Sequence, residues 1–249
     1  MNPDSIKRYA RHLVLKEIGG PGQQALLASR VVIVGAGGLG GPVGLYLAAA
    51  GVGHITLIDD DTIDLSNLQR QIQFETAEID QEKAVVMAER LKGINPDITL
   101  KPIVSRLTPK NAADLLEGHD LIIDGVDDFG ARFAINDAAL ELKTPLVSGA
   151  LGRFQGQVSA HKSNGDGPCY RCLVPDIPPG AETCSEVGIV GALAGIIGSV
   201  MALEAIKIIT GAGEPLFGRL WLYDGLKAEA RTITLPRDPH CTACAKQAS

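Results

Sequence analysis

With 249 residues, 45% of them hydrophobic, the chain is long enough to bury a large core, which excludes an intrinsically disordered protein. Its formal net charge is −6 and no basic run stands out, so the sequence lacks the electrostatic signature of a nucleic-acid-binding protein. Any anionic ligand must therefore be bound by a few local cations.

The first 29 residues are predicted to form a helical segment ahead of the first strand. The chain starts with the polar run Met-Asn-Pro-Asp-Ser-Ile-Lys-Arg, which has no apolar signal core. A secretory signal peptide needs such a core, so we expect a cytoplasmic protein.

An apolar strand then runs into a glycine-rich turn. Residues 31–34 are β-branched and wholly apolar, which is typical of a parallel strand covered on both faces. In the motif Gly-Ala-Gly-Gly-Leu-Gly that follows, Gly35 permits the tight turn and Gly37 lets the backbone approach a ligand. Gly40 lets the predicted helix over 38–50 pack closely on the sheet. The free N–H groups at the start of this helix suit an anion.

A second strand, predicted over 54–58, ends at an acidic residue. Asp59 lies about twenty residues beyond the glycines, where a carboxylate can accept hydrogen bonds from ribose hydroxyls. The pattern predicts an adenine-nucleotide site. The alternative is a tight βα turn that binds no ligand.

Helical and strand patterns then alternate along the chain. The predicted elements are a helix over 82–94, a strand over 98–104, a helix over 111–117, a strand over 121–124, a helix over 131–142 and a strand over 145–148. This alternation predicts an α/β fold with a Rossmann-like, doubly wound and mainly parallel sheet. Ligands are expected at the carboxyl ends of the strands, where Gly35, Asp59 and Asp127 fall.

From Arg153 onward the pattern changes to period two. Three segments alternate in this way and predict antiparallel strands that extend the sheet: 155–161, 219–223 and 230–235. The Pro/Gly-rich stretch 174–186 has the composition of a crossover loop. The uncharged run 187–203 is just short of a membrane span and carries four glycines, so we predict a buried, closely packed helix and no membrane association.

Two CxxC pairs predict a metal site. Cys169 and Cys172 form one pair, and Cys241 and Cys244 form the other. Four thiolates supplied in this way suit tetrahedral zinc with no open position, so the metal would be structural. Disulfides compete poorly in a chain expected to be cytosolic. Zinc would hold the C-terminal tail against the loop after the first antiparallel strand, and its removal should loosen the fold before it affects chemistry.

The fifth cysteine, Cys184, is left without a pair on the crossover loop. It is a candidate nucleophile or sulfur carrier, and the alternative is a cysteine that is merely tolerated. The neighbouring Glu182 and Glu186 would raise the pKa of its thiol rather than lower it.

Phosphate groups need positive charge, and three cations are candidates to supply it. They are Arg11 in the N-terminal segment, Arg70 after Ser-Asn-Leu-Gln, and Lys83 at the start of the helix over 82–94. Asp127 and Asp128 follow the strand over 121–124 and could hold Mg²⁺, which prefers carboxylate and phosphate oxygens. Taken singly, each of these residues could be a solvated surface charge.

Taken in order, these motifs resemble the ThiF/MoeB/HesA family, relatives of the ubiquitin-activating enzymes. The resemblance rests on Gly-Ala-Gly-Gly-Leu-Gly, Asp-Asp-Asp, Ser-Asn-Leu-Gln-Arg-Gln, Lys83, Asp127 and the paired CxxC motifs, and it runs from Arg8 to Cys244. It implies that ATP or its Mg²⁺ is contacted by Gly38, Asp59, Ser66, Asn67, Arg70, Lys83 and Asp127. We add Gly35, Gly37, Gly40, Asp61 and Asp128 to the candidate cofactor site. Arg11 would reach into the neighbouring subunit's site in a homodimer.

The resemblance implies one adenylation domain over 1–249. It would consist of the helical segment 1–29, a nucleotide-binding half over 30–150, and an antiparallel extension over 151–249 with the zinc site. The implied reaction is ATP-dependent adenylation of the C-terminal glycine of a ubiquitin-like sulfur carrier ending in Gly-Gly, with release of pyrophosphate. This step prepares the carrier for thiocarboxylate formation. The carrier could be the small subunit of molybdopterin synthase or a thiamine sulfur carrier.

The residue types fit this chemistry. A C-terminal carboxylate has a pKa of roughly 3.5, so it is ionised at neutral pH and needs no general base. The step needs neutralisation of the triphosphate and in-line positioning, which Arg11, Arg70, Lys83 and a metal on Asp127 would supply. Because the chain ends soon after Cys244, we expect a separate sulfur donor of the cysteine desulfurase or rhodanese type.

The chain departs from the family pattern at two positions. Asp128 stands where Asn is common, and His12 stands where Gln is common. Three alternatives remain open: a tRNA-modifying dehydratase of the same family, an NAD-dependent oxidoreductase with structural zinc, and a partner-binding scaffold without chemistry. The oxidoreductase does not explain Ser-Asn-Leu-Gln-Arg together with Lys83.

Overall fold

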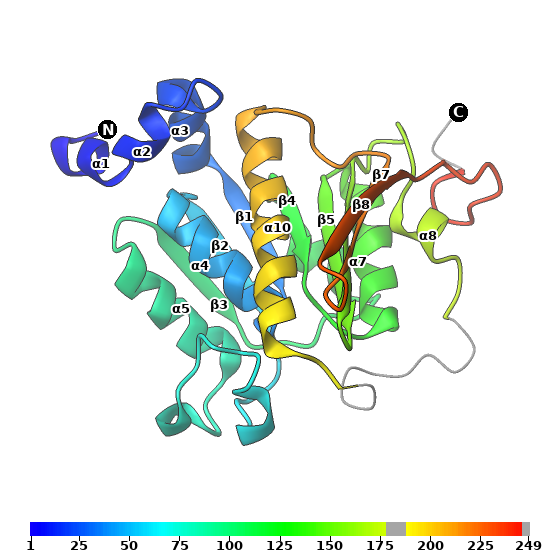
Figure 1. Cartoon of the computed structure of the whole chain (residues 1–249), viewed down its shortest axis with the longest axis horizontal. Helices are drawn as coiled ribbons and strands as arrows, with labels where there is room; N and C mark the ends of the chain where they lie inside the picture. The colour runs from blue at the N-terminus through cyan, green and yellow to red at the C-terminus, as the bar shows by residue number, and fades with distance from the viewer. Residues whose placement is uncertain (178–187, 246–249) are drawn as a thin grey trace.

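One eight-stranded sheet runs through the molecule, in the order β3-β2-β1-β4-β5-β6-β7-β8. The computed structural model describes residues 1–177 and 188–245 (Figure 1). Strands β1 to β5 are parallel, and β5 to β8 pair in antiparallel fashion, as the sequence predicts. The strands are β1 (Arg30–Val34), β2 (His54–Ile58), β3 (Thr99–Ile103), β4 (Leu121–Asp124), β5 (Leu146–Gly152), β6 (Gln155–His161), β7 (Arg219–Asp224) and β8 (Glu229–Thr234).

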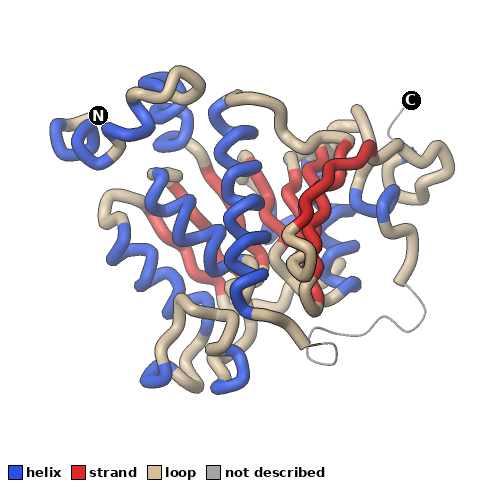
Figure 2. The backbone as a smooth tube through the Cα atoms, in the orientation of Figure 1, coloured by secondary structure: helices blue, strands red, loops and turns tan. Residues whose placement is uncertain are grey.

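Helices cover both faces of the sheet, and the strands between them are red in Figure 2. One face carries α4 (Gly40–Ala50), α5 (Lys83–Ile94) and α10 (Gly191–Thr210), and the other carries α6 (Ala112–Leu116) and α7 (Phe129–Leu142). Ahead of β1 lie α1 (Pro3–Arg8), α2 (Ala10–Leu13) and α3 (Gly19–Ala28), which confirms the helical N-terminal segment. Figure 1 shows these three helices at the amino ends of the parallel strands, opposite the carboxyl ends.

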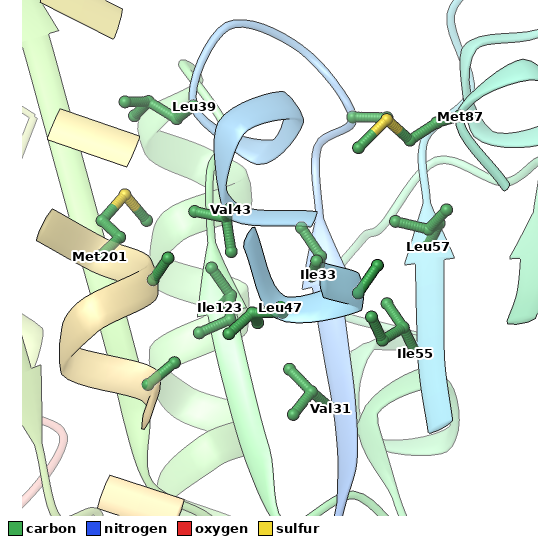
Figure 3. Close-up of a cluster of buried hydrophobic side chains, with 14 of the residues drawn as sticks. Val31, Ile33, Leu39, Val43, Leu47, Ile55, Leu57, Met87, Ile123 and Met201 are labelled. Atoms are coloured by element: carbon green, nitrogen blue, oxygen red, sulfur yellow. The ribbon is translucent and has the colours of Figure 1, made fainter. Parts of the chain in front are cut away.

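The core lies on both sides of the parallel strands because alternate residues of each strand face opposite ways. In β1, Val31 and Ile33 join the cluster under α4 and α5, whereas Val32 and Val34 join the cluster under α7. Figure 3 shows the first cluster, in which Val31 and Ile33 lie with Leu47 of α4. Burial on both faces explains why this strand is wholly apolar.

Helix α10 corresponds to the uncharged run that could be mistaken for a membrane span. By length and composition its 20 residues are sufficient to cross a membrane, but it packs on α4, β5 and β6 with Leu193, Ile197 and Met201 buried. A Cβ atom at Gly198 would lie 2.9 Å from the Leu39 carbonyl oxygen, so this glycine allows the close packing that the sequence predicts.

Some boundaries differ from the predictions. Helix α4 begins at Gly40 and not at residue 38, because Gly38 and Leu39 still belong to the turn. Strand β5 continues to Gly152 because it forms a hairpin with β6, in which Gly152 pairs with Gln155. The short helix α8 (Tyr170–Leu173) was not predicted.

Candidate functional site

A cleft of about 440 Å³ lies at the carboxyl ends of the parallel strands. Since Val34 is in register with both Ile58 and Asp124, the residues that follow these three strands meet at one edge of the sheet. The predicted residues that line the cleft are Gly35, Gly37, Gly38, Asp59, Asp61, Arg70, Lys83, Asp127 and Asp128. The fold therefore brings these predicted residues together around one cleft.

The glycine loop is held tightly against the sheet. Gly35 has a φ of +88°, and a Cβ atom there would lie 2.9 Å from the Gly125 carbonyl oxygen. Gly40 does not line the cleft; a Cβ atom there would lie 1.8 Å from the Gly35 carbonyl oxygen, which accounts for the close helix packing. The buried Gln73 amide donates to the carbonyl oxygens of Ala36 and Gly37 at 2.8 and 3.1 Å.

Asp59 joins the second strand to the glycine loop. Its Oδ2 accepts a hydrogen bond from the Ala36 N–H at 2.7 Å, and its Oδ1 accepts one from the Asp61 N–H at 2.9 Å. Burial raises the pKa of Asp59 above its ordinary value, although these hydrogen bonds and Lys83 act in the opposite direction. A carboxylate has about four lone-pair sites, so Asp59 keeps acceptor capacity for a ligand.

Two cations enter the cleft from different elements. Lys83, the first residue of α5, has only 5% of its surface exposed, and its Nζ lies 2.8 Å from Oδ2 of Asp61. Arg70 is half-buried and donates to the Ser66 carbonyl oxygen at 3.0 Å. An ammonium group has three donors and a guanidinium has five, so both groups can also bind an anion in the cleft.

Ser66 and Asn67 do not line the cleft, as judged from the described residues. They lie in a short 3₁₀ turn, Leu65–Asn67, that Asp64 caps. Both the N–H and the hydroxyl of Ser66 donate to Asp64, and these bonds lower the pKa of Asp64. In this structure the Ser66 side chain stabilises the turn that presents Arg70.

The two neighbouring aspartates have different surroundings. Asp127 is exposed and lines the cleft, so its carboxylate is free to bind a hard cation there. Asp128 is the N-cap of α7, and its Oδ2 accepts a hydrogen bond from the Ala131 N–H at 2.7 Å. Asn caps helices about as well as Asp, so an Asn at this position would keep the cap.

Sequence reasoning missed several residues of the cleft. Arg132 is 5% exposed and donates to Oδ2 of Asp124 and to Oγ of Ser148, both at 3.1 Å. Burial raises the pKa of Asp124, while Arg132 and Ser148 oppose that shift. An arginine in a helical pattern is expected to face solvent, so no sequence pattern pointed to the burial of Arg132. The other missed residues include Gln71, Ser105, Arg106, Leu107 and Tyr170.

The four paired cysteines come together as predicted. The Sγ–Sγ distances are 3.6 Å for Cys169–Cys241, 3.5 Å for Cys172–Cys244 and 4.0 Å for Cys169–Cys172, and all four atoms lie within 4.8 Å of one another. A tetrahedron with Zn–S bonds of about 2.3 Å has edges of about 3.8 Å, so the cluster fits zinc. Burial and neighbouring thiols raise the pKa of Cys172 to about 11, which disfavours bare thiolates without a cation.

Arg11, a further predicted site residue, does not line the cleft either. Arg11 is exposed on α2, which lies near the amino ends of the parallel strands, at the other end from the cleft (Figure 1). Cys184 lies outside the described residues, so its predicted role stays a prediction.

Comparisons with known proteins show what this chain is similar to. The profile of the ThiF family matches residues 9–243. A Thermus thermophilus protein named sulfur carrier protein adenylyltransferase is 43% identical over 247 residues, which cover 97% of this chain and 91% of that protein. The Mycobacterium tuberculosis protein named probable adenylyltransferase/sulfurtransferase MoeZ is 44% identical over 96% of this chain, which spans 62% of that protein's length.

A maize protein named adenylyltransferase and sulfurtransferase MOCS3-1 is 43% identical, and this chain spans 52% of its length. Among solved structures, E. coli MccB superimposes with a TM-score of 0.84 at 22% identity, over 95% of this chain and 72% of that one. At this identity the likeness shows a shared fold alone.

Proposed function

The chain belongs to the ThiF family, and on this premise we propose that it uses ATP to adenylate the C-terminal carboxylate of a sulfur carrier protein. The observation that carries the proposal is the convergence of the glycine loop, Arg70, Lys83 and Asp127 on one cleft. A volume of about 440 Å³ falls in the range of small-molecule sites, about 300–1,000 Å³. A relative named for this activity matches nearly the whole chain.

The reaction needs little from the protein beyond positioning and charge. A carboxylate oxygen of the carrier attacks the α-phosphorus of ATP, the bond from that phosphorus to the bridging oxygen breaks, and pyrophosphate leaves with the electron pair. Lys83 and Arg70 neutralise the phosphates, and Asp59 accepts hydrogen bonds from the ribose. Asp127 would hold Mg²⁺, which when bound supplies further neutralising charge. The ionised carboxylate requires no base.

Arg11 is assigned to the cleft of a second copy of the chain in a homodimer. Its exposure on α2 and its distance from the chain's own cleft support this assignment (Figure 1). Mixing Arg11→Ala with Arg70→Ala protein should then restore part of the activity that each variant lacks, because a mixed dimer contains one intact cleft. No recovery on mixing would argue against a shared site.

The carrier is expected to end in Gly-Gly and to receive its sulfur from a separate protein. This chain spans 62% and 52% of the lengths of the two relatives named adenylyltransferase and sulfurtransferase. The four-cysteine cluster would hold zinc in a structural role. We also expect the enzyme to act in the cytoplasm.

The decisive experiment is ATP–pyrophosphate exchange with a panel of carriers that end in Gly-Gly. Exchange should require Mg²⁺ and an intact carrier, and a carrier without its last glycine is the matched control. Absence of exchange with every carrier, together with stabilisation of the protein by NAD and not by Mg·ATP, would favour the oxidoreductase instead.

A further inference from the structure

The cysteine cluster and the cleft share one structural element. Helix α8 is only four residues long, and it carries Tyr170 between Cys169 and Cys172. Tyr170 is 3% exposed and its side chain forms part of the cleft wall, as does Val174 just after the helix. A change in the backbone of this helix must therefore move both the thiols and the cleft wall.

Tyr170 is held firmly from the side of α7. Its backbone N–H donates to Oδ1 of the buried Asn136 at 2.8 Å. The phenol ring lies 6.1 Å from the ring of Phe133, and the Arg132 guanidinium lies 5.9 Å from its centroid. A guanidinium at this distance from an aromatic ring is attracted to the ring face. The position of the ring thus affects the position of Arg132.

Arg132 connects Tyr170 to the loop that carries Asp127. Besides Asp124 and Ser148, it donates to the Val126 carbonyl oxygen. Val126 directly precedes Asp127, and its own N–H donates to Oδ1 of Asp124 at 3.2 Å. The loop that presents Asp127 is therefore fixed by a buried arginine that packs on Tyr170.

The same loop also touches the glycine motif. The Gly125 carbonyl oxygen lies 2.9 Å from the position of a Cβ atom at Gly35. A continuous set of contacts therefore runs from Cys169 through Tyr170 and Arg132 to the loop at 125–127. Every residue in it is buried, except the loop itself.

We propose that Tyr170 and Arg132 are positioning residues that couple the order of the four-cysteine cluster to the binding of Mg·ATP. The inference rests on the proposed ATP site and gives the metal a second role. Zinc bound by the cysteines fixes α8, α8 fixes the Tyr170 ring, and the ring keeps Arg132 on the loop that carries Asp127. Because such coupling is reciprocal for binding, Mg·ATP should also increase the retention of zinc.

The test is titration calorimetry of Mg·ATP with the full chain, with the zinc content and far-UV spectrum measured for every sample. Zinc-loaded wild-type protein sets the reference affinity, and failure to bind there would contradict the proposed function itself. Removal of zinc with a chelator should weaken Mg·ATP binding by about fivefold or more. Zinc-loaded Tyr170→Leu should show a similar loss, and chelation of this variant should add little to it.

Two further variants separate positioning from general destabilisation. Tyr170→Phe keeps the ring under Arg132 and removes only the phenol oxygen, which also contacts the Arg132 side chain, so this variant should bind Mg·ATP more tightly than Tyr170→Leu. Arg171→Ala is the matched control, because Arg171 lies between the same cysteines but pairs with Asp137 at 2.7 Å and does not line the cleft. It should lower thermal stability and leave the affinity unchanged.

Wild-type affinity in zinc-loaded Tyr170→Leu would overturn the proposal, as would an equal loss in Arg171→Ala. If Tyr170→Leu does not fold, zinc-free wild-type protein decides. If the zinc-free protein keeps its secondary structure and binds Mg·ATP as tightly as the zinc-loaded protein, the proposed coupling is wrong.

Discussion

The parallel and antiparallel parts of the sheet differ in the contacts that stabilise them. Strands β1, β2 and β4 are buried on both faces, and a residue of the cleft follows each of them directly. By contrast, all six residues of β8 are exposed. In this part of the molecule, cysteines 72 positions apart in the chain lie next to each other. Chemistry is thus assigned to the part whose order comes from its own core, and the proposed zinc site would stabilise the other part.

Lys83→Ala should have the largest effect and should affect chemistry without affecting the fold. Asp61, the carboxylate partner of Lys83, has 68% of its side chain exposed, so loss of the ion pair costs little stability. Pyrophosphate exchange should fall by about 1,000-fold or more, because a buried cation is lost from the phosphate site.

The matched control is Lys92→Ala on the same helix, where the ammonium donates to the Pro96 carbonyl oxygen away from the cleft. Exchange should continue at a near-normal rate in this variant. A near-normal rate in Lys83→Ala would remove this lysine from the mechanism and weaken the assignment of chemistry to the parallel part.

Cys241→Ser should have the next largest effect, on the stability of the antiparallel part. Loss of a structural metal site costs about 4 kcal/mol, which lowers the Tm of a chain of this size by about 8–16 °C. Zinc content and thermal unfolding measure the change, and the adjacent exposed His240→Ala serves as control. If Cys241→Ser retains stoichiometric zinc and the wild-type Tm, the cluster does not stabilise this part of the fold.

His161 should make the antiparallel part sensitive to acid. Its Nδ1 donates to the Pro168 carbonyl oxygen and its Nε2 accepts from Ser159, both at 3.0 Å. Burial lowers the pKa of His161 to about 4 from its ordinary value of 6.5. Between these values the unfolded chain binds more protons than the folded one, so the free energy of unfolding decreases as pH falls from 6.5 to 4.

The full contribution is roughly 3 kcal/mol, since one pKa unit corresponds to about 1.4 kcal/mol. Acid also releases zinc from thiolates, so the measurement is the difference between wild type and His161→Gln in denaturant unfolding across this pH range. That difference should shrink as pH falls. A constant difference would mean that His161 does not titrate in this range.

The sequence predicted the parallel part well because its signals are local. An apolar, β-branched run that ends in Gly or Asp marks β1, β2 and β4 to within one residue. The four cysteines were also assigned correctly to one cluster, since the CxxC spacing within each pair is a local signal. Helix α8 was missed because four residues show no periodicity.

Arg132 was missed for a different reason, because its burial depends on a partner in another element. Only the fold brings its guanidinium to Asp124 of β4 and Ser148 of β5. Ser66 was assigned to the nucleotide from motif resemblance and Asp128 from its place after a strand, whereas the structure also gives both residues local backbone contacts. Such contacts depend on where a helix or turn begins, which sequence patterns place only to within a few residues.

The smallest expected effect is that of Asp128, where variants distinguish a helix cap from a ligand of the metal or nucleotide. As the N-cap of α7 it accepts from the Ala131 N–H, so Asp128→Ala should cost about 1 kcal/mol and Asp128→Asn only a few tenths. Denaturant unfolding measures both changes. If capping is its main role, Asp128→Asn should also keep nearly full exchange activity, whereas Asp127→Asn should lose it because an amide is a weaker ligand for Mg²⁺. Equal loss of exchange in both variants at unchanged stability would return Asp128 to the nucleotide site, and the cleft would then bind its metal through two adjacent carboxylates.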